Sequence, residues 1–171
     1  MKLRKVAVVV PVILVGLLGG ILPASAKVEF EPNIVKPNTH VGLGVIVTKD
    51  CSKSLTTELQ IKLPSNLNIK EIMVVGVFQN NRIPKGWGLN LIEKSRLLVA
   101  KGPSIKTSSS NPLKINFMLT IPNEKNGTVI NFPTVQSCGS SKVAWTVPMT
   151  PSKAGKSSTN LNSPYLIVGK K

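Results

Sequence analysis

The sequence predicts an all-β protein made of short antiparallel strands, and the spacing of its apolar residues is the main reason. In the run LKINFMLTI, every second position from Leu113 to Ile121 is apolar, while Lys114, Asn116 and Thr120 lie between them. A strand with one buried face has this pattern because successive side chains point to opposite sides of the sheet. No segment of helical length shows a clean period of 3.6 residues.

Other strand candidates follow along the chain, each bounded by Pro, Gly, Asn or Ser. The run TELQIKL repeats the alternation, so Leu59, Ile61 and Leu63 are expected to face the core. The remaining candidates are Val28–Phe30, Val41–Val47, Ile72–Phe78, Leu97–Ala100, Val129–Phe132, Val143–Val147 and Tyr165–Val168. About eight or nine short strands favour an antiparallel β-sandwich with an immunoglobulin-like arrangement, and a closed barrel is the alternative.

Two segments interrupt the strand pattern. Residues 101–112 and 150–164 are rich in Ser, Pro, Gly and Lys. Such composition is typical of exposed loops, because these residues favour turns and lack apolar side chains to bury. Both segments are therefore predicted to lie outside the sheets.

The N-terminus has the three parts of a secretory signal peptide. Basic residues within the first five positions precede an apolar run over 6–22, and the small residues Ala24-Ser25-Ala26 follow. Cleavage is expected after Ala26, which leaves residues 27–171 as a single domain in an extracytoplasmic location, periplasmic or secreted. The alternative is an uncleaved anchor, since the run approaches the length of a spanning helix. Once cleaved, the protein is not expected to be an integral membrane protein.

The chain is strongly basic, with 22 Lys and Arg residues against seven Asp and Glu residues. Removing the three basic residues of the signal and no acidic ones leaves a charge of +12. Such a charge attracts anionic lipid or cell-wall polymer, although a solvated basic surface is the simpler interpretation. Nucleic acid is not an expected partner, because the protein is exported, its lysines are scattered and it has few aromatic residues to stack on bases.

The residues needed for enzyme chemistry are scarce. The sequence has one histidine, His40, no Gly-x-Ser-x-Gly motif and no evident pair of acidic residues. Neither a Ser-His-Asp relay nor a two-carboxylate glycosidase can be assembled from this set. His40 stands alone at the edge of a predicted strand, so we interpret it as a solvated or structural residue and the protein as a non-enzyme.

What the two cysteines indicate depends on the compartment, because disulfides persist outside the cytoplasm and are rare inside it. Cys138 ends a strand-like run before a Gly-Ser turn, and Cys51 follows the Val41–Val47 strand. In an oxidising compartment, a pair of cysteines predicts one disulfide rather than a thiol nucleophile.

Three stretches of sequence together carry a family resemblance: VTKDCSKSLTTELQIKLPSNL (47–67), IPKGWGL (83–89) and FPTVQSCGSSKVAW (132–145). Their order and approximate spacing resemble the cysteine-containing branch of the exported YcnI-like copper-binding domains. The resemblance spans almost the whole chain after the signal. It implies an immunoglobulin-like sandwich, in agreement with the strand pattern, and a role in copper homeostasis.

The resemblance also implies a copper site from which this sequence departs. In the family, copper is expected to bind the amino group and imidazole of a histidine exposed by signal cleavage, assisted by an acidic residue and a tryptophan. Lys27 occupies the place of that histidine and has no imidazole nitrogen. Trp145 matches the tryptophan directly. Asp50 or Glu29 is the candidate acid, because Ser52 stands where relatives commonly carry one.

Three classes of function follow. The first is a metal-handling module with a degenerate site of Trp145, Lys27 and Asp50 or Glu29, which binds copper or a copper-handling protein. The alternative is a metal-free binding or scaffold domain whose basic surface meets an anionic partner, and an enzyme is the least favoured class. Trp145 does not decide among them, because a strand-end tryptophan is more often core than ligand. Trp87 could likewise cap the core or line a groove.

Overall fold

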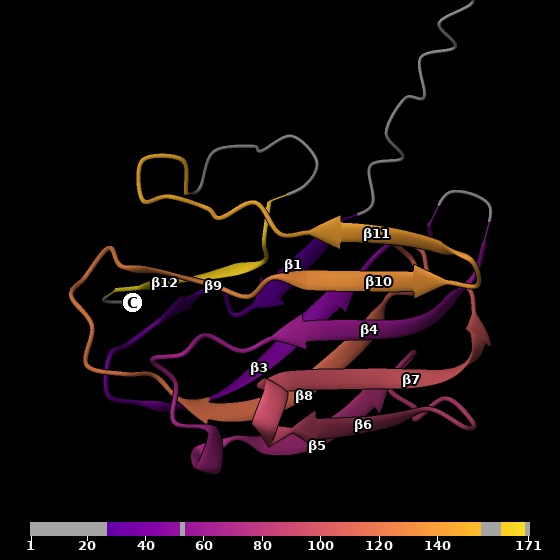
Figure 1. Cartoon of the computed structure of the whole chain (residues 1–171), viewed down its shortest axis with the longest axis horizontal. Helices are drawn as coiled ribbons and strands as arrows, with labels where there is room; N and C mark the ends of the chain where they lie inside the picture. Colours follow the sequence, from indigo (N-terminus) through magenta and orange to yellow (C-terminus); the bar gives the residue numbers. More distant parts are fainter. Residues whose placement is uncertain (1–26, 52–53, 155–161, 170–171) are drawn as a thin grey trace, which may run out of the picture.

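The computed structural model describes residues 27–51, 54–154 and 162–169, which form twelve β-strands and two short 3-10 helices (Figure 1). Two antiparallel sheets face each other, and a small third sheet lies beside them. The predicted β-sandwich is therefore confirmed. The predicted signal peptide, residues 1–26, lies outside the described residues. The described part of the chain has no helix that is long and apolar enough to cross a membrane.

The first sheet has the strand order β1-β3-β8-β5, with every neighbouring pair antiparallel. Its strands are β1 (Val28–Glu31), β3 (His40–Val47), β5 (Met73–Phe78) and β8 (Leu113–Thr120).

The second sheet has the order β11-β10-β4-β7-β6 and is also antiparallel throughout. Its strands are β4 (Thr56–Lys62), β6 (Gly88–Ile92), β7 (Leu97–Ile105), β10 (Thr134–Cys138) and β11 (Ser141–Trp145).

The third sheet has the order β2-β12-β9, in which β2 and β12 are parallel. Its strands are β2 (Ile34–Val35), β9 (Val129–Asn131) and β12 (Tyr165–Val168). The 3-10 helices η1 (Ile69–Glu71) and η2 (Glu93–Ser95) precede β5 and β7.

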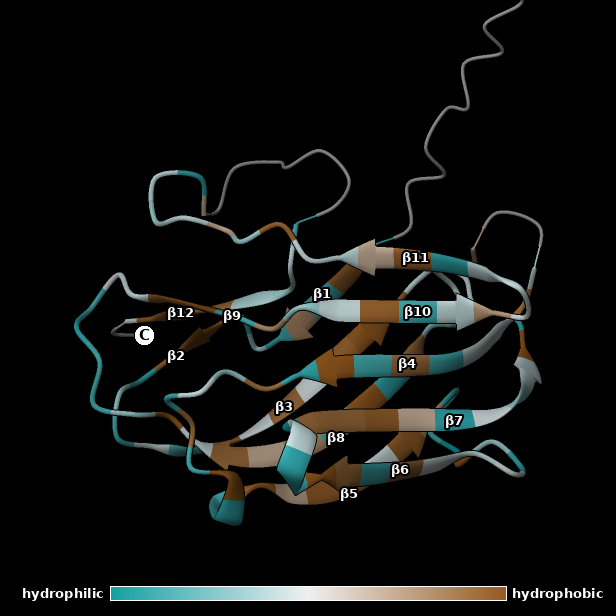
Figure 2. Ribbon diagram, viewed as in Figure 1, coloured by the Kyte–Doolittle hydropathy of each residue, from teal (hydrophilic) through white to brown (hydrophobic). Residues whose placement is uncertain are grey.

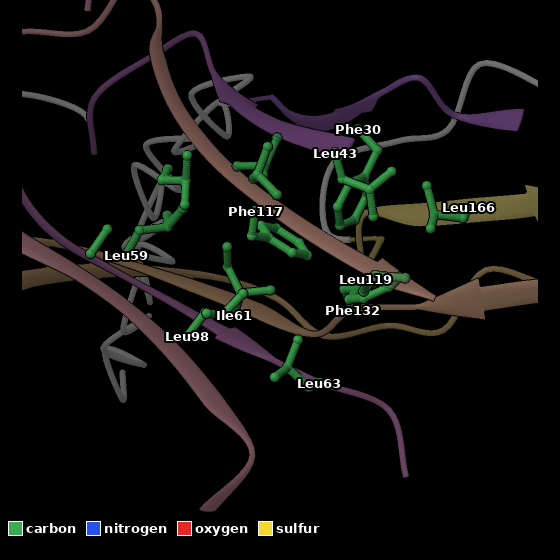
Figure 3. Packing of buried hydrophobic residues seen from close by; sticks show 14 of the residues in the cluster. Phe30, Leu43, Leu59, Ile61, Leu63, Leu98, Phe117, Leu119, Phe132 and Leu166 are labelled. Atoms are coloured by element: carbon green, nitrogen blue, oxygen red, sulfur yellow. The ribbon is translucent and has the colours of Figure 1, made fainter. Parts of the chain in front are cut away.

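The core lies between the two large sheets and follows the alternation of the sequence. On β8 the expected face from Leu113 to Ile121 is buried, and on β4 the residues Leu59 and Ile61 are buried as well. Figure 3 shows Phe117 directed toward the side chains of the opposite sheet. The ring of Phe30 lies edge-on to Phe117, at 6.2 Å between centroids. Figure 2 shows hydrophobic residues concentrated on the strands and more polar residues in the loops that join them.

The loop prediction for residues 101–112 is wrong in its first part, because β7 continues to Ile105. Backbone pairing with β4 and β6 extends this strand, and such pairing does not require alternating apolar residues. Gly102 is required here because a Cβ at this position would lie 2.5 Å from the indole of Trp87. The indole Nε1 donates to the carbonyl of Pro103 at 3.0 Å, so Trp87 is a core residue rather than a groove residue.

Because the strands alternate in direction, their connections gather at the two ends of the sandwich. One end, which we call the loop end, carries the β3–β4, β5–β6, β7–β8 and β10–β11 connections. Its described residues are 48–51, 54–55, 79–87, 106–112 and 139–140, and the first two residues of β11, Ser141 and Lys142, lie directly after the last of these connections. Lys27 also lies there, because its carbonyl accepts a hydrogen bond from the Thr48 amide at 3.2 Å.

Candidate functional site

The predicted disulfide between Cys51 and Cys138 is confirmed. It joins the segment after β3 in the first sheet to the end of β10 in the second, with the two Cα atoms 5.8 Å apart. Both cysteines are buried, and the Cys51 amide donates to the Cys138 sulfur at 3.1 Å. The bridge therefore fastens the two sheets together at the loop end.

Asp50, which the sequence offered as a metal ligand, anchors loops in the structure. Its Oδ1 accepts hydrogen bonds from the amide and hydroxyl of Thr56, at 3.2 and 2.8 Å. It also accepts from the Thr107 hydroxyl at 2.9 Å, while the Thr107 amide lies within 3.2 Å of both carboxylate oxygens. Because this carboxylate already has four protein donors around it, its role is to hold the β7–β8 loop against the start of β4.

Buried Gln136 on β10 extends this network toward the disulfide. Its Nε2 donates to the Lys49 carbonyl at 3.0 Å and to the Thr56 hydroxyl at 2.6 Å. Its Oε1 is buried and has no hydrogen-bond partner in the structure. Gln136 and Asp50 thus meet at the same Thr56 hydroxyl, one as donor and one as acceptor.

Lys27 and Glu29 pair with each other at the start of β1. The Lys27 Nζ lies 2.6 Å from Glu29 Oε1, and both side chains are more than half exposed. An exposed pair of this kind contributes little stability. The Lys27 backbone is held by Thr48, which brings the first described residue close to the loop that carries Asp50.

Trp145 is a core residue at the end of β11. Its side chain is only 3% exposed and belongs to the main apolar cluster. Its backbone pairs with Thr134 of β10, and its carbonyl accepts from the Ser163 hydroxyl at 3.3 Å. β1 and β11 are edge strands of the two opposing sheets, and Figure 1 shows both along the upper side of the molecule.

The donors present do not fit the copper site that the resemblance implies. Lys27 has no imidazole, Asp50 is engaged by backbone and hydroxyl donors, and Trp145 is buried. Within the described ranges, no three His, Cys, Asp or Glu side chains gather closely enough to hold a metal ion. Ser52 lies outside the described residues.

His40 lies far from these residues, at the opposite end of β3 from Thr48. Its Nδ1 is 3.2 Å from the Thr120 hydroxyl on the neighbouring strand. Hydrogen bonding from Thr120 and then from Asn68 lowers the pKa of Glu71 below its ordinary value, and the charge of His40 adds a smaller effect. His40 thus belongs to a polar surface cluster at the end of the sandwich opposite the loop end.

The loop end carries a group of basic residues that is not visible as a run in the sequence. Its exposed cations come from three separate connections and from the start of β11, and they are Lys49, Arg82, Lys85, Lys106 and Lys142. Asp50 is the sole acidic residue among the described loop-end residues, and it faces the inner network. At the opposite end, Glu71, Glu93 and Glu124 lie among the basic residues. Sequence reasoning missed this group because the fold, and not proximity in the chain, assembles it.

Each of the four loops at the loop end is joined to another by the disulfide or by hydrogen bonds. The disulfide joins β10–β11 to β3–β4, and Asp50 joins β3–β4 to Thr107 of β7–β8. Gln79 of β5–β6 donates to the carbonyls of Lys106 and Asn111, at 2.8 and 3.2 Å. The basic residues are therefore mounted on loops whose bases are held in place.

A groove of about 630 Å³ at the opposite end is a weaker candidate. Two of its lining residues are basic, Lys62 and Arg96. The Lys62 Nζ donates to the Ser95 carbonyl at 2.6 Å, and the Arg96 guanidinium donates to the carbonyls of Pro64 and Leu67. Because both side chains are engaged with backbone carbonyls, their main contribution is to hold neighbouring loops.

No family model and no curated protein matches this chain. Among solved structures, it is similar to a protein of Nocardia farcinica described as having an immunoglobulin-like fold. The two are 16% identical with a TM-score of 0.58, over 85% of this chain and 97% of the other. This similarity confirms the immunoglobulin-like form of the sandwich.

Two further structures are similar at lower scores. One is a type I cohesin–dockerin complex from Clostridium thermocellum, at 10% identity and a TM-score of 0.45, over 84% of this chain and 99% of that one. The other is the collagen-binding domain of a Staphylococcus aureus adhesin, at 12% identity and a TM-score of 0.39, over 85% and 97%. At these scores the likeness carries no functional information. The chain is thus an immunoglobulin-like β-sandwich stapled by the Cys51–Cys138 disulfide.

Proposed function

We propose that this chain is a non-catalytic, extracytoplasmic binding domain that recognises an anionic partner through its loop end. The observation that carries the proposal is the set of exposed cations on three of the joined loops and at the start of β11, where the one acidic residue of those loops, Asp50, is turned inward. The disulfide supports the compartment, because such bonds persist in oxidising surroundings.

The physical basis is an electrostatic field from one end of the molecule. Like charges gathered at one end attract an anionic surface more strongly than the same charges mixed with carboxylates. Because the disulfide and Asp50 hold the loop bases, less conformational entropy is lost when the loops meet a partner. Binding should therefore weaken with rising salt concentration, as exposed charges are screened.

A pair of charge-reversal variants tests this proposal. The double change Lys85→Glu and Lys106→Glu acts on the loop end, whereas Lys94→Glu and Lys125→Glu makes the same change in net charge at the opposite end. We expect the first variant to elute from a heparin column at a clearly lower salt concentration than the second. Equal elution of the two variants would show that net charge alone governs binding and would contradict the proposal.

Copper handling, which the sequence resemblance implies, is a second candidate. It is favoured by one observation, namely that β1, which follows Lys27, and β11, which ends at Trp145, are edge strands along the same side of the sandwich. The missing donor is the imidazole that Lys27 cannot provide. Lys27→His would restore the imidazole, while Asp50 would remain bound by Thr56 and Thr107 and Trp145 would remain buried.

Lys27→His is expected to raise Cu(II) affinity by about 100-fold or more, because it would place an imidazole beside a free α-amine at the expected cleavage point. Cu(II) titration of the wild type and the variant measures the change, after mass analysis has verified that each chain begins at residue 27. Lys27→Gln is the matched control, since it removes the ammonium without adding an imidazole. Equal tight binding by wild type would show that the site uses other donors, whereas no gain in the variant would mean that its supporting residues are also absent.

A further inference from the structure

We infer that the loop end docks on the surface of an anionic phospholipid bilayer, an assignment that rests on the proposed function and names its partner. Charge alone does not distinguish a bilayer from a soluble polyanion. The distinction comes from exposed apolar side chains among the cations, and from the place where residues 1–26 join the fold.

Ile83 is the most exposed large apolar side chain of the described chain, at 64%. It follows a two-residue turn in which Asn80 and Asn81 adopt left-handed backbone angles, with φ of 50° and 59°. Backbone hydrogen bonds in both directions between Gln79 and Arg82 close this turn, at 2.8 and 3.0 Å. Ile83 therefore projects from a compact loop, with Arg82 immediately before it and Lys85 two residues later.

The base of the same loop is fastened to β7. Trp87 donates to the Pro103 carbonyl at 3.0 Å, and a Cβ at Gly86 would lie 3.1 Å from the Pro103 ring. Gly86 also has a φ of +77°, which favours glycine at this turn. The loop can thus present Ile83 with only a small loss of conformational entropy on docking.

Leu55 supplies a second exposed apolar side chain, at 43%, on the β3–β4 connection. It directly precedes Thr56, whose amide and hydroxyl are bound by Asp50. Single exposed apolar residues are ordinary on protein surfaces. Two of them on anchored loops that also carry exposed cations match the chemistry of interfacial membrane binding, in which apolar side chains enter the headgroup region and basic ones attract anionic lipid.

The point of attachment of the N-terminal segment favours a bilayer over a soluble polymer. The apolar run at 6–22 ends only a few residues before Lys27, and a run of this length and hydropathy partitions into membranes. Lys27 is bound to Thr48, at the base of the loop that carries Lys49 and Leu55. As long as the N-terminal segment remains attached, the loop end is therefore the end of the sandwich closest to the lipid surface.

Vesicle binding tests this inference with residues 27–171, which contain every strand and helix of the described fold. We expect binding to vesicles of phosphatidylcholine with phosphatidylglycerol, and little binding to phosphatidylcholine alone. The double variant Leu55→Ser and Ile83→Ser should weaken binding to the anionic vesicles by about tenfold or more, because it removes apolar area that enters the interface.

The matched control is Met73→Ser with Val147→Ser, because these side chains are also exposed, at 57% and 51%, but lie outside the loop end. It should bind vesicles like the wild type. If the loop-end variant and this control bind equally well, or if vesicles are not bound while heparin still distinguishes the charge-reversal pairs, the bilayer assignment is overturned and the proposed function stands. If neither vesicles nor heparin responds to loop-end changes, both are overturned.

An insertion measurement gives an independent readout. In Ile83→Trp, the new indole should be quenched by brominated lipid in anionic vesicles, whereas Met73→Trp should not be quenched beyond the wild-type level. The native Trp87 and Trp145 give a low background because they are only 7% and 3% exposed. Vesicle binding with no quenching of Ile83→Trp would show purely electrostatic contact and would contradict insertion.

Discussion

Replacing both Cys51 and Cys138 by alanine is expected to lower the free energy of unfolding by about 4–5 kcal/mol, the largest single loss that we predict. The bridge spans 87 positions, so its removal restores much conformational freedom to the unfolded chain. Both cysteines are buried, and the lost sulfur atoms add a small packing defect.

Denaturant titration of the double variant and the oxidised wild type measures this loss. The double variant is preferred to either single one, because a single substitution leaves a free thiol. Wild type treated with reductant serves as a control and should approach the stability of the double variant. Unchanged midpoints, or two free thiols counted in unfolded and unreduced wild type, would contradict the prediction.

Phe117→Ala should cost about 3–5 kcal/mol, as truncation of a large aromatic side chain in a packed core does. Phe117 is fully buried on the central strand β8 and meets Phe30 edge-on. The alanine variant would leave a cavity between the two sheets, lined by side chains that rigid strands hold apart.

Lys114→Ala on the same strand is the matched control for Phe117→Ala. Lys114 points to the opposite face, where its Nζ lies 3.3 Å from Glu31 in an exposed pair. Such pairs contribute between about 0 and 1 kcal/mol, so this variant should be nearly neutral. Similar unfolding midpoints for the two variants would mean that the register of β8 is shifted by one residue.

The alternation of apolar residues was enough to predict β8 and β4, because one face of each strand must be buried and the period of two determines which. It could not predict β6. That strand lies at a sheet edge and has no fully buried residue from Gly88 to Ile92, so its strand state depends on pairing with β7. The end of β7 was missed for a related reason, since Gly102 is explained only by Trp87, which is distant in the sequence.

The candidate site was likewise predictable only in part from the sequence. The disulfide was predictable because two cysteines in an exported chain have few alternatives. The anchoring role of Asp50 was not, because its partner Thr107 is 57 residues away. The cations of the loop end were read from the sequence as scattered, and only the order of the strands shows that their loops share one end.

Because the loops are joined to one another near the strand ends, their tips are suitable places for inserted sequences. Asp50, Gln79 and the disulfide act where the loops leave the strands, whereas the turn at Asn80 and Asn81 lies beyond these contacts. Foreign residues inserted between Asn80 and Asn81 would extend outward without touching the fastened bases. The sandwich is in this respect a display scaffold, in which new recognition sequences can be carried on one end while the strands that support them stay unchanged.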